Sequence, residues 1–368
     1  MIVKNNYNEC ITNLACSIRK YFDLDYSHNT LSYIDKLLEK KQPKNVVVIL
    51  FDGMGSRILD RTLDKDDFFI KNMKKEITTV FPATTTAATY SMMTGLNPIE
   101  HGYLGWYSYI EPLDEVIVLF RGINKDTQEL SERYAEARQK YFVNKTITDE
   151  INEKGKYKSR ILFPFGDDKY NDLDDMLSII EKECSSDGKK YIYAYDNQPD
   201  HTMHELGSDS DQVKELIKSR NKKVEYLCNK LEDTIVFVIA DHGHIKVDNI
   251  FLNDYPEIVN MLERTTSLEQ RAVSFKIKDG LHQKFEKLFR ELFGDYFNLY
   301  TKTEIIESKL FGDGEENPLF RSALGDYIAI AENSNKTLLA ENDETDFSQH
   351  AGYTDDEIFI PLIIIDKT

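Results

Sequence analysis

The chain has 368 residues, of which 41% are hydrophobic and 30% are charged, and its formal net charge is −18. This composition is typical of a globular protein with one large or two ordinary domains. The negative charge argues against binding to a nucleic-acid polymer. The longest apolar runs are far shorter than the roughly 20 residues that span a bilayer, so we also expect no membrane partner.

The N-terminal residues and the cysteines bear on the cellular compartment. No basic stretch followed by an apolar one occurs near Met1, so no signal peptide is predicted. The four cysteines lack the spacing of a CxxC motif or a zinc finger; they are Cys10, Cys16, Cys184 and Cys228. We therefore expect a cytoplasmic protein with reduced thiols.

Apolar runs rich in β-branched residues alternate with segments of helical periodicity. The predicted strands are residues 46–51, 77–81, 116–120, 191–195, 235–240 and 358–365. The predicted helices are residues 31–41, 133–153, 173–183 and 209–231. Strands that are apolar throughout and are separated by helices are typical of a parallel sheet buried on both faces. The predicted fold class is α/β, with a mostly parallel central sheet flanked by helices.

Residues 246–347 show a different pattern. Charged helices are predicted at 281–293 and 302–309, short strands at 273–277 and 326–331, and the core pattern resumes only at Gln349. We therefore predict a catalytic core formed by residues 1–245 and 348–368, with an inserted α+β cap subdomain at 246–347. Ligands of open α/β sheets bind beyond the carboxyl ends of the strands, where such a cap would close over a substrate.

Acidic and imidazole side chains lie next to four of the predicted strands. Six of them are candidate metal ligands: Asp52, Asp200, His204, Asp241, His242 and His350. Crowded carboxylates repel one another unless cations neutralise them, and Asp together with His favours zinc or a similar transition metal. Asp200 and His204 are four residues apart, which places both on one face of a helix. Asp52 alone is explained equally well as a helix N-cap.

Three consecutive threonines, Thr84 to Thr86, follow the predicted strand at 77–81 and open a helix. The N-terminus of a helix offers free N–H groups and a positive dipole end, which suit a phosphate. A hydroxyl group held there beside a metal can ionise and attack phosphorus. The residues alone leave open which threonine would react, and a simple N-cap is the alternative. Combined with the Asp and His residues, they favour the catalytic interpretation.

Six segments, in this order, resemble the alkaline phosphatase superfamily and, within it, the nucleotide pyrophosphatase/phosphodiesterase (type I phosphodiesterase) family. They read VILFDG at 48–53, FPATTT at 81–86, TGLNPIEHG at 94–102, DHTMHELG at 200–207, ADHG at 240–243 and HAG at 350–352. The resemblance implies an alkaline-phosphatase-like core and a hydrolase of a small phosphoester, with a nucleotide as one candidate substrate. It implies two Zn²⁺ ions, or other divalent transition metals, the first held by Asp200, His204 and His350 and the second by Asp52, Thr85, Asp241 and His242.

The resemblance also implies a mechanism. Thr85, four residues after Phe81, is the implied nucleophile; it attacks phosphorus and forms a phospho-threonine-type intermediate, which water then hydrolyses. The chain departs from the family's pattern at Ala88, where the family has an asparagine. His101 belongs to the resemblance without a catalytic role, and His244 is left outside the ligand set.

Several alternatives to a phosphodiesterase or nucleotide pyrophosphatase stay open. A phosphomonoesterase, a phosphonate hydrolase or a phosphosugar mutase would use the same core, and a non-catalytic metal- and nucleotide-binding protein would share the site without turnover. A sulfatase is disfavoured because no cysteine lies in a Cys/Ser-x-Pro-x-Arg motif. The aromatic segment at 103–107 is interpreted as core packing in preference to a surface that stacks on a planar group.

Overall fold

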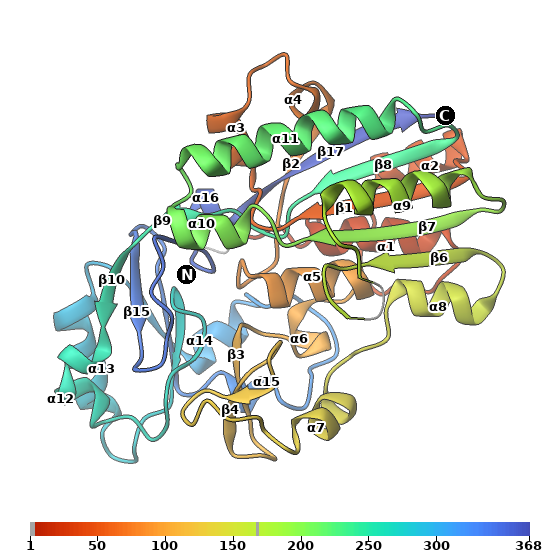
Figure 1. Cartoon of the computed structure of the whole chain (residues 1–368). Helices are drawn as coiled ribbons and strands as arrows, with labels where there is room; N and C mark the ends of the chain where they lie inside the picture. Colours follow the sequence, from red (N-terminus) through yellow and green to blue (C-terminus); the bar gives the residue numbers. More distant parts are fainter. Residues whose placement is uncertain (1–3, 167–168) are drawn as a thin grey trace.

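The computed structural model describes residues 4–166 and 169–368. The strands of its central sheet are β1 (Asn45–Phe51), β2 (Met73–Thr78), β6 (Lys158–Leu162), β7 (Lys190–Asp196), β8 (Thr234–Ile239) and β17 (Phe359–Lys367). They lie side by side in the order β2-β17-β8-β1-β7-β6 (Figure 1). Strands β8, β1, β7 and β6 run parallel, whereas β17 is antiparallel to both of its neighbours. The predicted α/β class with a mostly parallel central sheet is confirmed.

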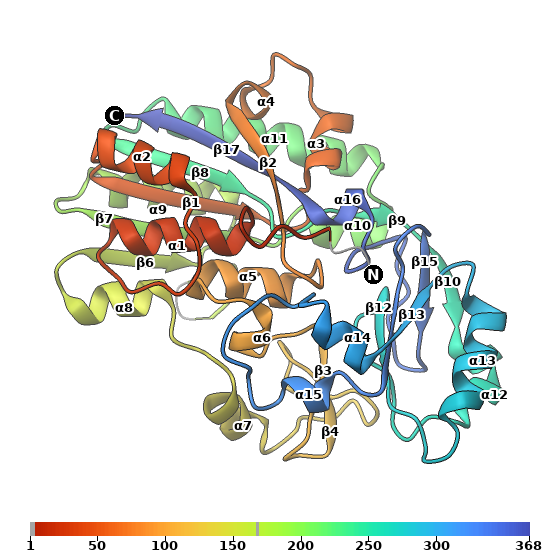
Figure 2. The ribbon, with the colours of Figure 1, turned by 180° about the vertical axis from the view of Figure 1, so that it is seen from behind.

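Helices cover both faces of this sheet, because its central strands are apolar on both sides. Every residue of β1, β7 and β8 is buried. One face carries α9 (Leu173–Ser185) and α11 (Asp211–Cys228), which lie in front in Figure 1. The other face carries α1 (Ile11–Tyr21), α2 (Ser32–Lys41), α5 (Thr85–Thr94) and α8 (Ile147–Lys154), which come to the front in Figure 2.

Two helices occupy the segment in which the sequence predicts a single helix at 133–153, so that prediction is wrong. They are α7 (Tyr134–Tyr141) and α8. Thr146 caps α8: its Oγ1 accepts a hydrogen bond from the Asp149 N–H at 3.2 Å, and the Asp149 carboxylate accepts one from the Thr146 N–H at 2.8 Å. This capping box begins a new helix inside the predicted one. The sequence analysis also misses α1 and the edge strand β6. The side chains of β6 are mostly partly exposed, so this strand lacks the continuous apolar run of the central strands.

A second sheet lies on the side toward which β1, β7 and β8 point (Figure 1). Its strands are β3 (Tyr107–Ile110), β4 (Glu115–Val118), β5 (Ile123–Asn124), β11 (Ser267–Leu268), β12 (Ala272–Phe275), β13 (Asn298–Thr301) and β14 (Tyr327–Ile330), in the order β13-β14-β12-β11-β3-β4-β5. All of its pairings are antiparallel. The strand predicted at 116–120 lies here as β4. Assigning it to the parallel sheet is wrong, since it pairs with its neighbour β3 in a hairpin.

This second sheet takes strands from both sides of the predicted boundary at residue 246. Strands β3 to β5 come from the predicted core and β11 to β14 from the predicted insertion. Helix α13 (His282–Phe293), which matches a predicted helix, packs on it: Phe285 and Phe289 contact Phe275 with ring centroids 5.3 and 5.5 Å away. The division into residues 1–245 with 348–368 and residues 246–347 stays a prediction.

The remaining elements are short. They are α3 (Ser56–Thr62), α4 (Phe68–Asn72), α6 (Pro98–His101), α10 (Asp200–Leu206), α12 (Pro256–Val259), α14 (Lys302–Glu307), α15 (Phe320–Ala323), α16 (Asp355–Ile358), η1 (Leu252–Asp254), β9 (Ile245–Lys246), β10 (Asp248–Phe251), β15 (Lys336–Leu339) and β16 (Ser348–Gln349). The four cysteines are buried free thiols. Among the residues that the structure describes, no helix combines the length and the apolar character needed to cross a bilayer.

A buried ion pair joins the second sheet to α16, and its carboxylate also holds the loop between β16 and α16. Arg271, in the turn between β11 and β12, donates from Nε and Nη2 to the two carboxylate oxygens of Glu357 at 2.7 and 3.0 Å. Glu357 also accepts a hydrogen bond from the Gly352 N–H at 2.7 Å. Burial raises the pKa of Glu357, but the charge of Arg271 outweighs it and holds that pKa below its ordinary value. The pair therefore fixes the loop that carries His350.

Replacing Glu357 by glutamine is expected to lower the free energy of unfolding by about 3–5 kcal/mol, because the change leaves the buried Arg271 guanidinium without its counter-charge. Denaturant unfolding at pH 7 measures this. Glu316→Gln is the matched control: its partner Arg321 is largely exposed, so little change is expected. Similar unfolding midpoints for the two variants would contradict the role given to the buried pair.

Candidate active site and metal centre

The predicted site residues converge at the carboxyl ends of the parallel strands. Asp52 follows β1, Asp200 begins α10 after β7, and Asp241 and His242 follow β8. The register pairs Phe51 with Asp196 and Leu50 with Ile239, so these three strands end side by side. His350 follows β16 and joins the cluster from a segment outside the central sheet. A parallel sheet thus assembles side chains that are far apart in the sequence.

One group of possible metal ligands is built around helix α10. Ligand atoms of Asp200, His204, His244 and His350 all lie within 4.8 Å of one another. His204 Nε2 is 3.4 Å and His350 Nε2 is 3.9 Å from Asp200 Oδ1. Asp200 and His204 lie one turn apart on α10, as their spacing predicts. The structure thus brings together the three residues expected to hold the first metal.

A second group adjoins the first. Ligand atoms of Asp52, Asp200 and His242 lie within 4.8 Å of one another, and His242 Nε2 is 3.2 Å from Asp52 Oδ1. Asp241 lies beside them: its Oδ2 is 3.7 Å from His242 Nε2, while its Oδ1 accepts hydrogen bonds from the Gly53 and His242 N–H groups, both at 3.0 Å. Asp241 Oδ2 is buried without a hydrogen-bond partner among the described residues. Asp200 is shared by both groups.

The electrostatics of this cluster fit a bound cation. Burial, followed by the charge of Asp52, raises the pKa of Asp241 well above its ordinary value. Burial lowers the pKa of His242, but the carboxylates of Asp241 and Asp52 outweigh it and raise that pKa to about 10. Both shifts have one cause, the crowding of buried carboxylates, which without a metal favours a proton on His242; a divalent cation would supply that positive charge instead. Carboxylate and imidazole donors in one cluster suit zinc or a similar transition metal.

Two of the three predicted histidine ligands are hydrogen-bonded through Nδ1, and the Nδ1 atom of the third faces a carboxylate. The Nδ1 atoms of His350 and His242 are hydrogen-bonded to the carbonyl oxygens of Ala83 and Gly243 at 3.0 and 3.1 Å. His204 Nδ1 lies 3.4 Å from Asp346 Oδ2. Such contacts fix the ring orientation and leave Nε2 directed toward the ligand cluster.

Thr85 is the threonine that lies against this cluster. It is the first residue of α5, and its Oγ1 lies 3.4 Å from each carboxylate oxygen of Asp52 and 3.2 Å from His242 Nε2. The hydroxyl groups of Thr84 and Thr86 are fully buried, with no hydrogen-bond partner in the described part of the chain. Of the three hydroxyl groups that the sequence leaves open, the structure places that of Thr85 beside the candidate ligands.

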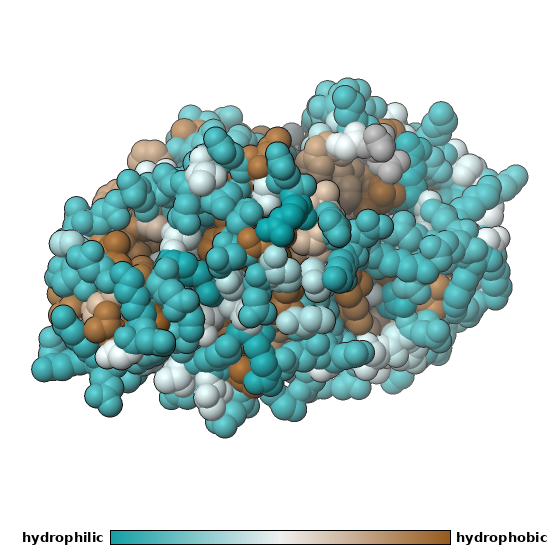
Figure 3. Space-filling model, turned by 90° about the horizontal axis from the view of Figure 1, so that it is seen from below, coloured by the Kyte–Doolittle hydropathy of each residue, from teal (hydrophilic) through white to brown (hydrophobic). Residues whose placement is uncertain are grey.

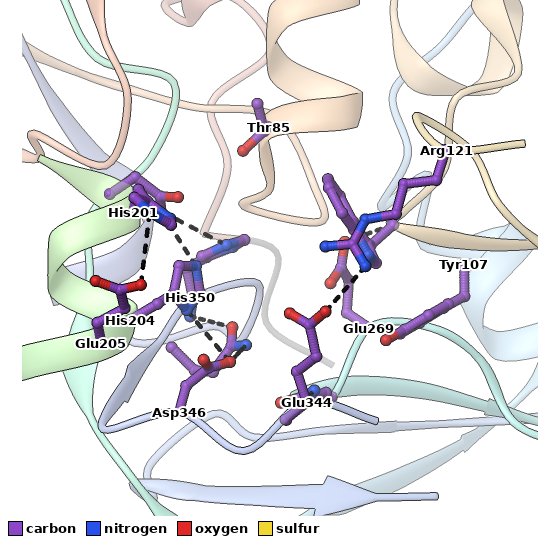
Figure 4. A pocket seen from close by; sticks show the side chains of 14 residues that line it. Thr85, Tyr107, Arg121, His201, His204, Glu205, Glu269, Glu344, Asp346 and His350 are labelled. Carbon is purple, nitrogen blue, oxygen red and sulfur yellow. Dashed lines mark hydrogen bonds and ion pairs between the residues drawn. The ribbon is translucent and has the colours of Figure 1, made fainter. Parts of the chain in front are cut away.

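Two cavities open beside Thr85. The smaller, about 250 Å³, is bounded by the ligand cluster on one side and by residues of the second sheet on the other (Figure 4). The larger, about 630 Å³, has an aromatic wall formed by Trp106, Phe120, Phe163, Phe165 and Tyr195. Seen from below, the molecule is mostly hydrophilic, with hydrophobic side chains gathered in its hollows (Figure 3). Thr85 and Trp106 line both cavities.

The aromatic segment that begins at Tyr103 is divided between packing and the cavities. Tyr103 is buried and stacks on Tyr90 with ring centroids 3.5 Å apart, as the packing interpretation expects. Trp106 and Tyr107 instead line the smaller cavity. His101 is fully buried; its Nδ1 accepts a hydrogen bond from the Tyr103 N–H at 3.1 Å, so it supports this packing and lines neither cavity.

His244 is the site residue that the sequence analysis leaves out. Its Nε2 is 2.5 Å from Asp200 Oδ1, and the side chain is fully buried. Burial lowers the pKa of His244 to about 4. The signal in the sequence was its place in Asp241-His242-Gly243-His244 at the end of β8. Its short contact with Asp200 indicates that it orients this shared carboxylate.

Replacing His244 by alanine is expected to weaken metal binding about 10- to 100-fold, because Asp200 loses the partner that orients it. Competition with a chromophoric chelator measures the affinity. His201→Ala is the control, since His201 lies on the same helix but is largely exposed and belongs to neither ligand group. Unchanged affinity in His244→Ala would remove this residue from the metal centre.

Comparisons with known proteins bear on the family and the fold of the chain. The model of a family described as type I phosphodiesterase / nucleotide pyrophosphatase matches residues 46–354. A comparison with curated protein sequences finds no match. The fold is similar to that of murine ectonucleotide pyrophosphatase/phosphodiesterase 5, solved as an inactive variant in complex with AMP, with 19% identity, a TM-score of 0.63 and 88% of each chain covered. It is also similar to phosphonoacetate hydrolase from Sinorhizobium meliloti in complex with phosphonoacetate, with 14% identity, a TM-score of 0.62, and 88% of this chain and 90% of that chain covered.

Proposed function

The chain belongs to the type I phosphodiesterase / nucleotide pyrophosphatase family, and from this premise we propose that it hydrolyses small phosphodiesters with Thr85 as the nucleophile. The observation that carries the proposal is the position of Thr85 Oγ1, which lies 3.2 Å from His242 Nε2 and 3.4 Å from both oxygens of Asp52. A hydroxyl group at this point would meet a phosphorus atom held between the two ligand groups.

The residues present fit two divalent metal ions, for which we propose zinc. Asp200, His204 and His350 would hold the first ion; Asp52, Asp241, His242 and the Thr85 oxygen would hold the second. When bound, such ions lower the pKa of the hydroxyl group and neutralise the charge that develops on the phosphoryl oxygens. The orphaned Asp241 Oδ2 and the raised pKa of this carboxyl group support the second site.

The chain's own groups supply the rest of the reaction. Thr85 Oγ1 gives up its proton and forms a bond to phosphorus in line with the leaving ester oxygen, which departs with the electrons of the broken bond and takes up a proton. The first residues of α5 present their N–H groups and the positive end of the helix dipole to the transferred phosphoryl group. Water then cleaves the phospho-threonine ester from the opposite side and restores the hydroxyl group.

The larger cavity supports a diester as the substrate. A phosphodiester carries two arms, and the cavity of about 630 Å³ beside Thr85 offers one of them an aromatic wall. Phe163 and Phe165 are stacked with ring centroids 5.3 Å apart, and planar rings of this kind pack well against a nucleobase. We therefore propose a nucleotide ester as one candidate. The structure of the murine relative in complex with AMP is consistent with it.

The test is the hydrolysis of bis(4-nitrophenyl) phosphate against 4-nitrophenyl phosphate by the zinc-loaded protein. We expect kcat/KM for the diester to exceed that for the monoester at least about tenfold. A preference for the monoester would move the enzyme to the phosphomonoesterase alternative. No turnover of either compound would favour the non-catalytic alternative.

A further inference from the structure

We propose that the smaller cavity beside Thr85 binds a primary ammonium group carried by one ester arm of the substrate. The inference rests on the proposed function, since it names the chemistry of an arm whose phosphorus lies at Thr85. Glu269 and Gln270, in the turn between β11 and β12, are the residues that would recognise the ammonium group.

The lining of this cavity is rich in carboxylates. Apart from Asp200, the carboxylates that line it are Glu205, Glu269, Glu344 and Asp346. The lining contains one guanidinium group, that of Arg121, and its Nη1 is 2.9 Å from Glu344 Oε1 (Figure 4). Asp346 faces His204, 3.4 Å away. The charges of Glu344 and Asp346 thus have partners within the structure, and the excess charge of the cavity is negative.

Glu269 is the buried carboxylate of this cavity. It is 7% exposed, and its Oε1 accepts a hydrogen bond from the Trp106 N–H at 2.6 Å. Within residues 4–166 and 169–368, no lysine, arginine or histidine forms an ion pair with it. Burial raises the pKa of Glu269 to about 7, which shows how costly the unpaired charge is in this place. A cationic ligand would offset that cost.

Gln270 adds a buried acceptor without a donor. The side chain is 6% exposed and lines the same cavity. Its Nε2 donates to the Glu344 carbonyl oxygen at 3.0 Å, whereas its Oε1 is buried with no hydrogen-bond partner among the described residues. A buried acceptor in this state is stabilised by a ligand that donates a hydrogen bond. A primary ammonium group has three donors and a positive charge, so it can satisfy Glu269 and Gln270 together.

Aromatic rings complete the cavity. Trp106 and Tyr107 both line it, and the faces of such rings attract cations. Both rings already have a cation nearby, since Arg121 Cζ lies 5.9 Å from the Trp106 centroid and Lys125 Nζ lies 3.9 Å from the Tyr107 centroid. A trimethylammonium group could use the rings but would leave the Gln270 acceptor without a donor. The acceptors therefore select the primary ammonium group.

The test compares three esters that differ in one arm: 4-nitrophenyl phosphates carrying a 2-aminoethyl, a propyl or a 2-(trimethylammonio)ethyl group. Calorimetry measures their binding to metal-loaded Thr85→Ala protein, which is expected not to turn them over. We expect the aminoethyl ester to bind about tenfold more tightly than the propyl ester, in which a methyl group replaces the ammonium group. In the Glu269→Gln, Thr85→Ala protein this ratio should approach one. Glu153→Gln removes the same charge at an exposed position that lines neither cavity, and it should preserve the ratio within about twofold.

Equal binding of the aminoethyl and propyl esters to the Thr85→Ala protein would overturn the proposal, whatever the effect of the Glu269→Gln substitution. Tighter binding of the trimethylammonio ester than of the aminoethyl ester would overturn the assignment to a hydrogen-bond donor. Hydrolysis by the parent protein is a separate readout. A protein that binds the aminoethyl ester preferentially but hydrolyses none of the three would support this subsite and contradict the proposed function. Hydrolysis of all three esters without a binding preference would support the proposed function and contradict this subsite.

Discussion

Replacing Thr85 by alanine is expected to lower kcat on bis(4-nitrophenyl) phosphate at least about a thousandfold while the metal content and the fold are retained. Loss of a nucleophile removes the bond-forming atom, and effects of this size or larger follow in other covalent hydrolases. Thr85 Oγ1 is the hydroxyl oxygen that lies 3.2 Å from His242 Nε2, and its loss leaves all the carboxylate and imidazole ligands of both sites in place. Initial rates and metal analysis on the same preparation measure the two quantities.

Two further variants make this result specific. Thr86→Ala removes a neighbouring buried hydroxyl group that lines neither cavity and should keep kcat within about tenfold. Thr85→Ser keeps an oxygen at the same position and should restore much of the activity lost in Thr85→Ala. If Thr85→Ala turned over at the parent rate, or if Thr86→Ala alone abolished turnover, Thr85 would not be the nucleophile.

Two single variants, each lacking one ligand of one site, are each expected to lose the metal ion of that site and to retain the other ion. His350→Ala takes an imidazole from the group around α10, and Asp241→Asn takes the orphaned carboxylate beside His242. Each variant should bind about one equivalent of zinc where the parent binds two, and each should lose diester hydrolysis, because both sites contribute to the reaction. Elemental analysis after dialysis measures the stoichiometry.

The control for this pair is His282→Ala, which removes a partly exposed histidine outside both ligand groups. It should bind two equivalents and turn over normally. A parent protein that binds a single equivalent would contradict the two-metal centre, as would full metal occupancy and parent activity in either ligand variant.

The core could be predicted from the sequence because its strands are buried on both faces. The runs at 46–51, 191–195 and 235–240 are apolar without interruption, and they form β1, β7 and β8. The direction of β17 could not be predicted, since an antiparallel strand buried on both faces has the same apolar pattern as a parallel strand buried on both faces. The second sheet could not be predicted for another reason. Leu268 pairs with Tyr107, 161 residues earlier in the chain, and no local sequence pattern indicates such a pairing.

The candidate site was predicted to the extent that its residues follow strands. Asp52, Asp241 and His242 stand directly after buried runs, and parallel strands bring such positions together. His244 was missed because its contact with Asp200 depends on how the loop after β8 folds back. Glu269 reaches the site only through the pairing of β11 with β3, so its role could not be inferred from its neighbours in sequence. The cytoplasmic location stays a prediction.

The central claim is that Thr85 attacks phosphorus and forms a covalent intermediate, and the stereochemical course of hydrolysis tests it most directly. A phosphorothioate diester of a single configuration is hydrolysed in ¹⁸O-labelled water, and the configuration of the chiral product is determined. Each in-line displacement inverts phosphorus, so attack by Thr85 followed by attack by water predicts net retention. Net inversion would show that water attacks the substrate directly, and it would contradict the assignment of Thr85 as nucleophile.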